Sequence, residues 1–264
     1  MSTVNGSRPL GTGAPARSAS WTSKALALMA NELRLAMRRG ESLLITFVIP
    51  AGVLLMFSAF DVSGGSSAGK PVDRMLPGSM SLAILAASMV SLAITTGFER
   101  SYGVLKRLGG SPAGTSALVA SKTAAVIVVE TVQVVLLVTI ALALGWSAGP
   151  VVSVALVVAG LLLGTVAFAG FGLLMAGTLR AEATLALANL LFLVSLVIGG
   201  VIMPLDKLPA TVASASALLP PAALTRVLTV GLGGATGDAT EAVVVLAVWA
   251  VLLAGLAARK FRWD

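Results

Sequence analysis

Long apolar stretches separated by short polar segments make up most of the chain. Six of them come close to the roughly 20 residues that a helix needs to cross a bilayer. They cover residues 43–60, 77–98, 123–145, 151–179, 184–203 and 242–258. The pattern therefore predicts an all-α membrane protein with a six-helix transmembrane domain over residues 42–258. Glycines repeated in the fourth stretch, Gly164, Gly170, Gly172 and Gly177, suggest close contacts with neighbouring helices, and the alternative is that glycine is simply frequent in membrane helices.

Two segments of different character precede the first stretch. Residues 1–20 are rich in Gly, Ser, Pro and Ala and are predicted to form a disordered tail. In residues 21–41, apolar and polar residues alternate with the period of an amphipathic helix. We expect this helix to lie in the membrane interface with its basic side toward anionic headgroups. Its apolar face carries Leu26, Met29, Leu33 and Met37, and its basic face carries Arg34 and Arg38. The alternative is a solvated helix beside the membrane with no docking role.

Composition narrows the class of protein. The chain is 57% hydrophobic and 11% charged, whereas soluble proteins are about 25% charged. It contains no Cys and no His, which excludes disulfides and the commonest metal ligand and neutral-pH base. We therefore expect no hydrolytic or redox chemistry, no catalytic residue and no metal site in this chain.

The net charge of +7 is explained by topology. Fourteen of the 18 Lys and Arg residues fall on one side of the predicted spans, in residues 1–41, 99–122, 180 and 259–264. Because basic flanks stay on the cytoplasmic side, both termini are expected to be cytoplasmic, including the short tail over 259–264. A nucleic-acid partner is not needed to account for the charge.

Two segments are expected on the outer side. Residues 61–76 are Gly/Ser-rich and predict a flexible loop. Prolines at 204, 209, 220 and 221 interrupt residues 204–238, where residues 212–219 and 222–232 are too short to span. We interpret them as two half-helices of a re-entrant hairpin in the outer leaflet, where irregular backbone must be shielded. The alternative is a helix lying on the surface.

The most informative segment lies between the second and third spans, at residues 99–112. Charges begin abruptly there, and a Val/Leu ridge at helical spacing is followed by a Gly-Gly break. Ser111 and Pro112 then have the residue types of an N-cap and a first helical position. We predict a short helix at the cytoplasmic membrane surface that contacts another protein and moves the two spans to which it is tied. Its residues are Glu99, Arg100, Gly103, Val104, Leu105, Lys106, Arg107, Leu108, Ser111 and Pro112.

This segment resembles a known family. Glu99-Arg100 followed by Gly103, Leu105, Leu108 and Ser111-Pro112 is similar to the Glu-Arg-x-x-Gly-x-Leu-x-x-Leu-x-x-(Thr/Ser)-Pro loop of the ABC-2 type exporter permeases. That class includes drug exporters and the polysaccharide and O-antigen exporters. The six spans, the N-terminal amphipathic helix and the Pro-rich segment 203–209 also match, so the likeness covers nearly all of residues 21–258. The short outer segment 61–76 fits no large external domain.

The resemblance implies the permease subunit of an ATP-driven, drug-exporter-like transporter in the cell inner (cytoplasmic) membrane. Two permeases pair, here expected as a homodimer among membrane lipids. Each docks one copy of an ABC ATP-binding subunit through the loop and the N-terminal helix. ATP and Mg²⁺ are then held by the partner. Residues 64–70 do match G-x-x-x-x-G-K, but Pro71 replaces the Ser/Thr that binds Mg²⁺, and we expect no flanking strand or helix.

Three polar residues inside the spans are further candidates. Glu130 and Gln133 lie one turn apart in the third span and Asn189 lies in the fifth. Ionisable groups at such positions usually face a partner or a cavity, so we expect Glu130 to face the interior and help admit substrate. The alternative is a protonated or hydrogen-bonded Glu that joins helices. Few aromatic residues favour a lipophilic or amphipathic substrate over a bulky polymer.

Two other functions compete with the exporter permease. An ion-driven secondary carrier predicts paired acidic residues in the spans or broken helices in two repeats, and one Glu with no visible inverted repeat argues against it. A membrane scaffold or assembly protein that transports nothing is the other alternative.

Overall fold

The computed structural model describes residues 20–38, 40–60, 70–109, 114–149, 151–200, 209–235 and 237–261, and no strand occurs among them. In chain order the elements are α1 (Trp21–Arg38), α2 (Gly40–Phe60), α3 (Pro71–Ile84), the π-helix η1 (Leu85–Ser91), α4 (Leu92–Ser101), α5 (Val104–Gly109), α6 (Gly114–Ala143), α7 (Val154–Thr178), α8 (Ala181–Ile198), α9 (Ala210–Ala217), α10 (Pro220–Gly231) and α11 (Thr240–Lys260).

The helices confirm an all-α, multi-pass membrane protein. Five are long and apolar enough to cross a bilayer: the continuous α3–η1–α4 segment, α6, α7, α8 and α11. The first predicted span is α2, whose apolar part, Thr46–Ala59, is shorter than the others. The helices α9 and α10 meet at an angle of 82°, and together they form a further candidate span that is broken at the bend. The two predicted half-helices therefore exist, each starting about two residues earlier than expected.

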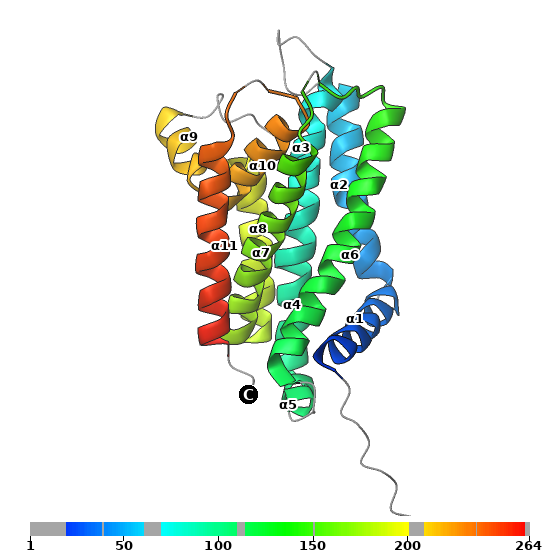
Figure 1. Cartoon of the computed structure of the whole chain (residues 1–264), viewed down its shortest axis with the longest axis vertical. Helices are drawn as coiled ribbons and strands as arrows, with labels where there is room; N and C mark the ends of the chain where they lie inside the picture. Colours follow the sequence, from blue (N-terminus) through cyan, green and yellow to red (C-terminus); the bar gives the residue numbers. More distant parts are fainter. Residues whose placement is uncertain are drawn as a thin grey trace, which may run out of the picture.

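The spans pack into one bundle around α7, which contacts α11, α4, α10 and η1 (Figure 1). The α3–η1–α4 segment is the most enclosed of the spans. Figure 1 shows α5 protruding at one end of the bundle, with α1 tilted beside the adjoining part of α6, and α9 at the opposite end. We call the first of these the α5 end. The end of α11 also lies at the α5 end (Figure 1).

A π-helix inside the second span is a feature that the hydropathy pattern did not predict. At η1 the Ser88 hydroxyl donates to the carbonyl oxygen of Ile84 at 2.5 Å. A Cβ atom on Gly172 of α7 would lie 2.9 Å from the carbonyl oxygen of Met89, which is too close for a side chain. The wider turn of η1 therefore packs directly on a glycine of α7.

The segment between α2 and α3 is shorter than the predicted loop. The prediction of a loop over residues 61–76 is wrong for its last six residues, because α3 begins at Pro71. Proline suits this first helical position, since its missing N–H would have no helical partner, and the Asp73 carboxylate accepts a hydrogen bond from the Lys70 N–H at 3.1 Å. A helix thus follows residues 64–70, contrary to expectation, although proline still replaces the Mg²⁺-binding Ser/Thr.

Several predicted features lie outside the described residues. They are the tail up to residue 19, most of the loop before α3, residues 203–208 of the Pro-rich segment 203–209, the Ser111-Pro112 pair and the last three residues. The bent pair α9–α10 that follows the Pro-rich segment is described. Its bend is held to α11 by a hydrogen bond from the Trp249 indole N–H to the carbonyl oxygen of Leu218, at 2.9 Å.

The predicted glycine contacts of the fourth span are confirmed. Gly164 lies against Leu224 of α10, and Gly177 lies against Phe261. Gly170 brings two spans into backbone contact, because a Cβ there would lie 2.7 Å from the backbone nitrogen of Ala254 in α11. Backbone cannot move aside as a flexible side chain can, so α7 and α11 can only pack in this way with glycine at position 170.

We therefore expect Gly170→Ala to lower the Tm of the purified protein by several degrees, with overpacking costing about 1–3 kcal/mol. The matched control is Gly255→Ala on α11, where an added Cβ meets nothing within 4 Å. That variant should keep or slightly raise the Tm, because alanine favours helix over glycine. Thermal unfolding followed by size-exclusion chromatography measures both, and equal Tm values for the two variants would contradict the packing argument.

Candidate functional site at the α5 end

A short reversal of the chain produces the protruding helix α5. Gly103 has a φ of +69°, a left-handed conformation that glycine adopts without strain, and it separates α4 from α5. Leu105 is 0% exposed and anchors α5 to the bundle. Lys106 and Arg107 are exposed on the other side, and Tyr102 at the start of the turn is 72% exposed. The predicted helix is confirmed, with one apolar side turned inward and a basic, aromatic side turned outward.

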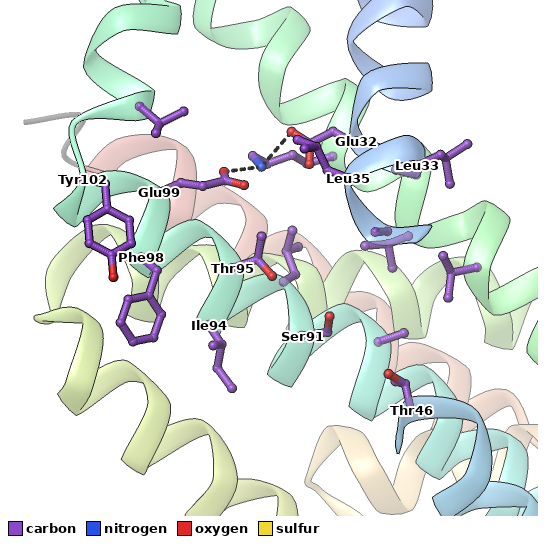
Figure 2. A pocket seen from close by; sticks show the side chains of 18 residues that line it. Glu32, Leu33, Leu35, Thr46, Ser91, Ile94, Thr95, Phe98, Glu99 and Tyr102 are labelled. Atoms are coloured by element: carbon purple, nitrogen blue, oxygen red, sulfur yellow. Dashed lines mark hydrogen bonds and ion pairs between the residues drawn. The ribbon is translucent and has the colours of Figure 1, made fainter. Parts of the chain in front are cut away.

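A buried ion cluster at the end of α4, just before this helix, joins α4 to α1 and α6 (Figure 2). The Lys122 ammonium of α6 donates to Glu99 Oε2 of α4 at 2.6 Å and to Glu32 Oε1 of α1 at 2.8 Å. Only 3% of the Lys122 side chain is exposed. An ammonium has three donors, and two of them bind these carboxylates. Three helices distant in sequence, α1, α4 and α6, therefore meet at one cation.

The next residue ties the same turn to a fourth helix. Arg100 Nη1 donates to the carbonyl oxygen of Ala176 in the last turn of α7, at 2.8 Å. A guanidinium suits this position because the last carbonyls of a helix carry partial negative charge. Glu99 and Arg100 thus connect the start of the protrusion to α1, α6 and α7.

The loop residues predicted from the sequence divide into two groups. Glu99 and Leu105 are buried, and Arg100 and Gly103 are half-buried, so these residues position the turn. The exposed members are Val104, Lys106 and Arg107. The side chain of Leu108, as well as Ser111 and Pro112, lies outside the described residues. A surface offered to another protein would therefore not use Leu105 of the predicted Val/Leu ridge.

Helix α1 has two apolar sides. Leu26 and Met37 of the predicted apolar face are exposed, as are Arg34 and Arg38, while Met29 and Leu33 are half-buried. The half-buried side also includes Leu28, Glu32 and Leu35, and it packs toward α6. One side of α1 is therefore free to contact lipid, and the other contributes Glu32 to the ion cluster.

The sequence analysis missed Glu32, Lys122 and Tyr102 as site residues. Two signals were available in the pattern: a lone acid within a basic amphipathic helix, and a lysine at the edge of the third apolar stretch. Neither signal identifies its partner, because the pairing depends on how α1 folds back on α6. An exposed tyrosine beside a basic helix was the signal for Tyr102.

A groove of about 520 Å³ opens beside the ion cluster, between α1, the α4–η1 segment and α6. We call it the α1 groove. Figure 2 shows Leu33, Ile94 and Phe98 along it, with Glu32 and Glu99 at one end and Thr46 of α2 at the other. The volume is in the range of sites for drug-sized molecules. Apolar walls with charges at one end suit an amphipathic molecule.

The polar residues inside the spans do not converge on this groove. Glu130 is 5% exposed and Gln133 is buried, and neither lines the α1 groove. Gln133 Nε2 donates to the carbonyl oxygen of Thr46, which joins α6 to α2, at 2.9 Å. Asn189 is exposed on α8 and donates to Leu185 in its own helix. The structure therefore does not bring Asn189 to the other two residues.

Glu130 instead joins three elements. Its Oε2 atom lies 2.5 Å from the Thr165 hydroxyl of α7, which also lies 2.7 Å from the carbonyl oxygen of Leu161. Ser88 of η1 contacts the same carboxyl group. A hydroxyl has a single hydrogen, so Thr165 cannot donate fully to both neighbouring oxygens. A protonated Glu130 that donates to Thr165 satisfies both contacts, and this favours the alternative in which Glu130 joins helices.

No group of three or more His, Cys, Asp and Glu side chains capable of holding a metal ion is found in the part of the chain that the structure describes. The α5 end instead combines a short protruding helix, the ion cluster beside it, the amphipathic helix α1 and the ends of three spans.

A multi-pass membrane protein with these parts falls into the class of transporter membrane components. The profile of the family described as "ABC-2 type transporter" matches residues 24–232, which is most of the chain. The chain belongs to the ABC-2 type transporter family. A search of curated proteins finds no match. Members of this family are generally non-catalytic membrane components, and membership implies an ABC ATP-binding partner.

The ion cluster generates a stability prediction. Lys122→Met should lower stability by about 3–5 kcal/mol, because it leaves Glu99 and Glu32 without their shared cation. Adding Glu99→Gln to Lys122→Met should recover part of the lost Tm. Lys106→Met, an exposed lysine on α5, is the control and should change the Tm little. If Lys122→Met melts like the wild type, the cluster does not hold the three helices together.

The buried contacts of Glu130 generate a second stability prediction. Glu130→Gln should keep nearly the wild-type Tm and transport activity, because the amide N–H₂ can donate to Thr165 in place of the carboxyl proton. Glu130→Ala should cost about 1–3 kcal/mol, since it removes buried hydrogen bonds and leaves their partners unsatisfied. Thermal unfolding and transport by the reconstituted protein measure the two effects. A Glu130→Gln variant that is stable but does not transport would contradict this prediction and indicate that Glu130 acts in the transport pathway.

Proposed function

We propose that this chain is the permease subunit of an ATP-driven exporter of the ABC-2 type, with the α5 end in the cytoplasm. Two chains form a homodimer in the inner membrane, and each docks one separate ABC ATP-binding subunit that holds ATP and Mg²⁺. The orientation is supported by the excess of Lys and Arg in the segments at the α5 end. The substrate is lipophilic or amphipathic, a choice supported by the apolar walls of the α1 groove.

The observation that carries this proposal is the Glu99–Lys122–Glu32 cluster. Through it, and through the hydrogen bond from Arg100 to Ala176, the end of α4 that leads into α5 is joined to α1, α6 and α7. A displacement of α5 by a docked ATPase would therefore reach the second, third and fourth spans together with the interfacial helix. Packed elements respond to such a displacement by moving as units, because cores do not deform continuously.

The docking surface in this proposal is the exposed side of the protrusion: Tyr102, Val104, Lys106 and Arg107. Aromatic and arginine side chains contribute most of the binding energy at many protein interfaces. Glu99 and Leu105 act from behind this surface, since both are buried. Substitutions at these two positions would disturb the permease itself, so they do not isolate docking.

We expect the double variant Tyr102→Ala, Arg107→Glu to reduce co-purification of the ATPase subunit by about tenfold or more, because truncating hot-spot residues costs 2 kcal/mol or more. Its Tm should remain within a few degrees of the wild type. The matched control is Arg259→Glu, an exposed arginine at the same end of the bundle on α11, which should retain the ATPase.

The experiment uses the permease co-expressed with its ABC ATP-binding partner, and ATPase activity is measured in proteoliposomes. Loss of co-purification in the double variant alone supports docking at α5. Retention of the ATPase by the double variant, or equal loss in the Arg259 control, would place the docking surface elsewhere. Transport driven by an ion gradient without any ATPase would replace the proposal with a secondary carrier.

A further inference from the structure

One strongly polar side chain of the spans faces out of the bundle. Asn189 is exposed on α8, whereas Glu130 and Gln133, the other two polar candidates, are buried. Asn189 is the ninth of the 18 residues of α8, so it lies about 12 Å from the nearer end of the helix. Among the described residues of the candidate spans, it is the one exposed amide side chain. At this depth in a bilayer the amide meets no water.

The hydrogen bonds of Asn189 are only partly made. Its Nδ2 atom donates to the carbonyl oxygen of Leu185, one turn earlier in the same helix, at 2.9 Å. That bond uses one of the two amide hydrogens, and the amide oxygen accepts none from the residues that the structure describes. A polar group without a hydrogen-bond partner is costly in hydrocarbon. The amide therefore calls for a partner from outside this chain.

Asn189 belongs to a continuous exposed stripe of α8. The stripe recurs at helical spacing, and we call it the α8 face; its members are Leu185, Ala186, Asn189, Leu193 and Val197. Another side of α8 packs on α4 and η1, where a Cβ on Gly97 would lie 3.6 Å from Thr184. The α8 face is thus open, on a helix that is attached directly to the second span.

A second copy of this chain offers what the amide lacks. An amide carries both a donor and an acceptor, so two Asn189 side chains can exchange N–H···O=C hydrogen bonds. Copies of this protein share one orientation in the membrane, so a twofold axis between them runs along the membrane normal. Such an axis brings α8 beside its own copy with both amides at the same depth. Lipid tails have no hydrogen-bonding groups, so an acyl chain on the α8 face would leave the amide without a partner.

We propose that the α8 face forms a contact between two copies of this chain, with the Asn189 side chains paired across the twofold axis. This deepens the proposed function: it rests on the proposed homodimer and names a surface that forms it. Helices that cross at Asn189 separate toward their ends, so Glu182 in the first turn of α8 is not forced against its copy. Because α8 packs on α4, whose end leads into α5, a movement of the protrusion reaches this contact through one pair of packed helices.

The chain contains no cysteine, so single-cysteine variants can report the contact. Ala186→Cys and Leu193→Cys lie one turn on either side of Asn189 and leave the amide in place. We expect oxidation with copper phenanthroline in membranes to link at least one of them into disulfide dimers, measured by non-reducing electrophoresis. The matched controls are Val135→Cys of α6 and Val251→Cys of α11, which are exposed apolar positions on other spans and should stay monomeric.

The amide itself is tested in whichever of these two variants is linked. Adding Asn189→Leu should weaken self-association by about fivefold or more, because it removes the hydrogen bonds between the helices at similar size. The readout is the protein-to-lipid ratio at which half of the chains are linked during a short oxidation. Asn189→Gln retains a donor and an acceptor and should recover part of the loss.

Absence of linking at both Ala186 and Leu193 would exclude the α8 face, and equal linking at the control positions would show random collision instead of a contact. Linking that Asn189→Leu leaves unchanged would also overturn the proposal. The assay contains no ATPase, so a failure of ATPase docking at α5 leaves its result standing. Linking at Val135 or Val251 alone would keep the homodimer of the proposed function and reject the α8 face.

Discussion

A single buried cation determines how the α5 end of this protein is built. Lys122 lies among apolar helices, where an unpaired ammonium would be costly, and it is stable there because carboxylates from α1 and α4 both reach it. Glu99 has the same need for a charge partner, because it is itself buried and requires a cation. The interfacial helix, the base of the protrusion and the third span therefore keep fixed positions relative to one another. A protrusion with a weaker attachment would bend without moving the spans.

The bundle behind this cluster depends on close backbone contact. Lipid provides no hydrophobic force to bring spans together, so packing and buried hydrogen bonds do so. Gly170 lets α7 meet the backbone of α11, and Gly172 lets it meet the carbonyls of η1. Glu130 adds hydrogen bonds from α6 at the level of η1. The wide turn of the second span is consequently held from two sides, directly above the segment that ends in the protrusion.

The α1 groove and the base of α5 share two side chains of the ion cluster. Its wall includes Glu99 and Lys122, which anchor α5, and its lining continues up the apolar faces of η1 and α6. A ligand in the groove and a partner on α5 would act on the same ion pairs from opposite sides. In the function proposed above, this gives a direct physical route between a ligand in the groove and the ATP-binding partner, with no long chain of intermediates.

Hydropathy and residue type were enough to predict the spans, the amphipathic helix, the short helix after Glu99 and the bent pair α9–α10, because each depends on local composition and helical period. The glycine contacts of α7 were suggested by residue type, but only the structure distinguished packing glycines from glycines that are merely frequent in membrane helices. The tertiary structure alone decided which side of each helix is buried, and so it turned Leu105 inward, left Asn189 exposed and paired Lys122 with two acids from distant segments. It also decided the π-helix and the start of α3 at Pro71. Pairing and burial depend on how helices far apart in sequence meet, and no local pattern contains that information.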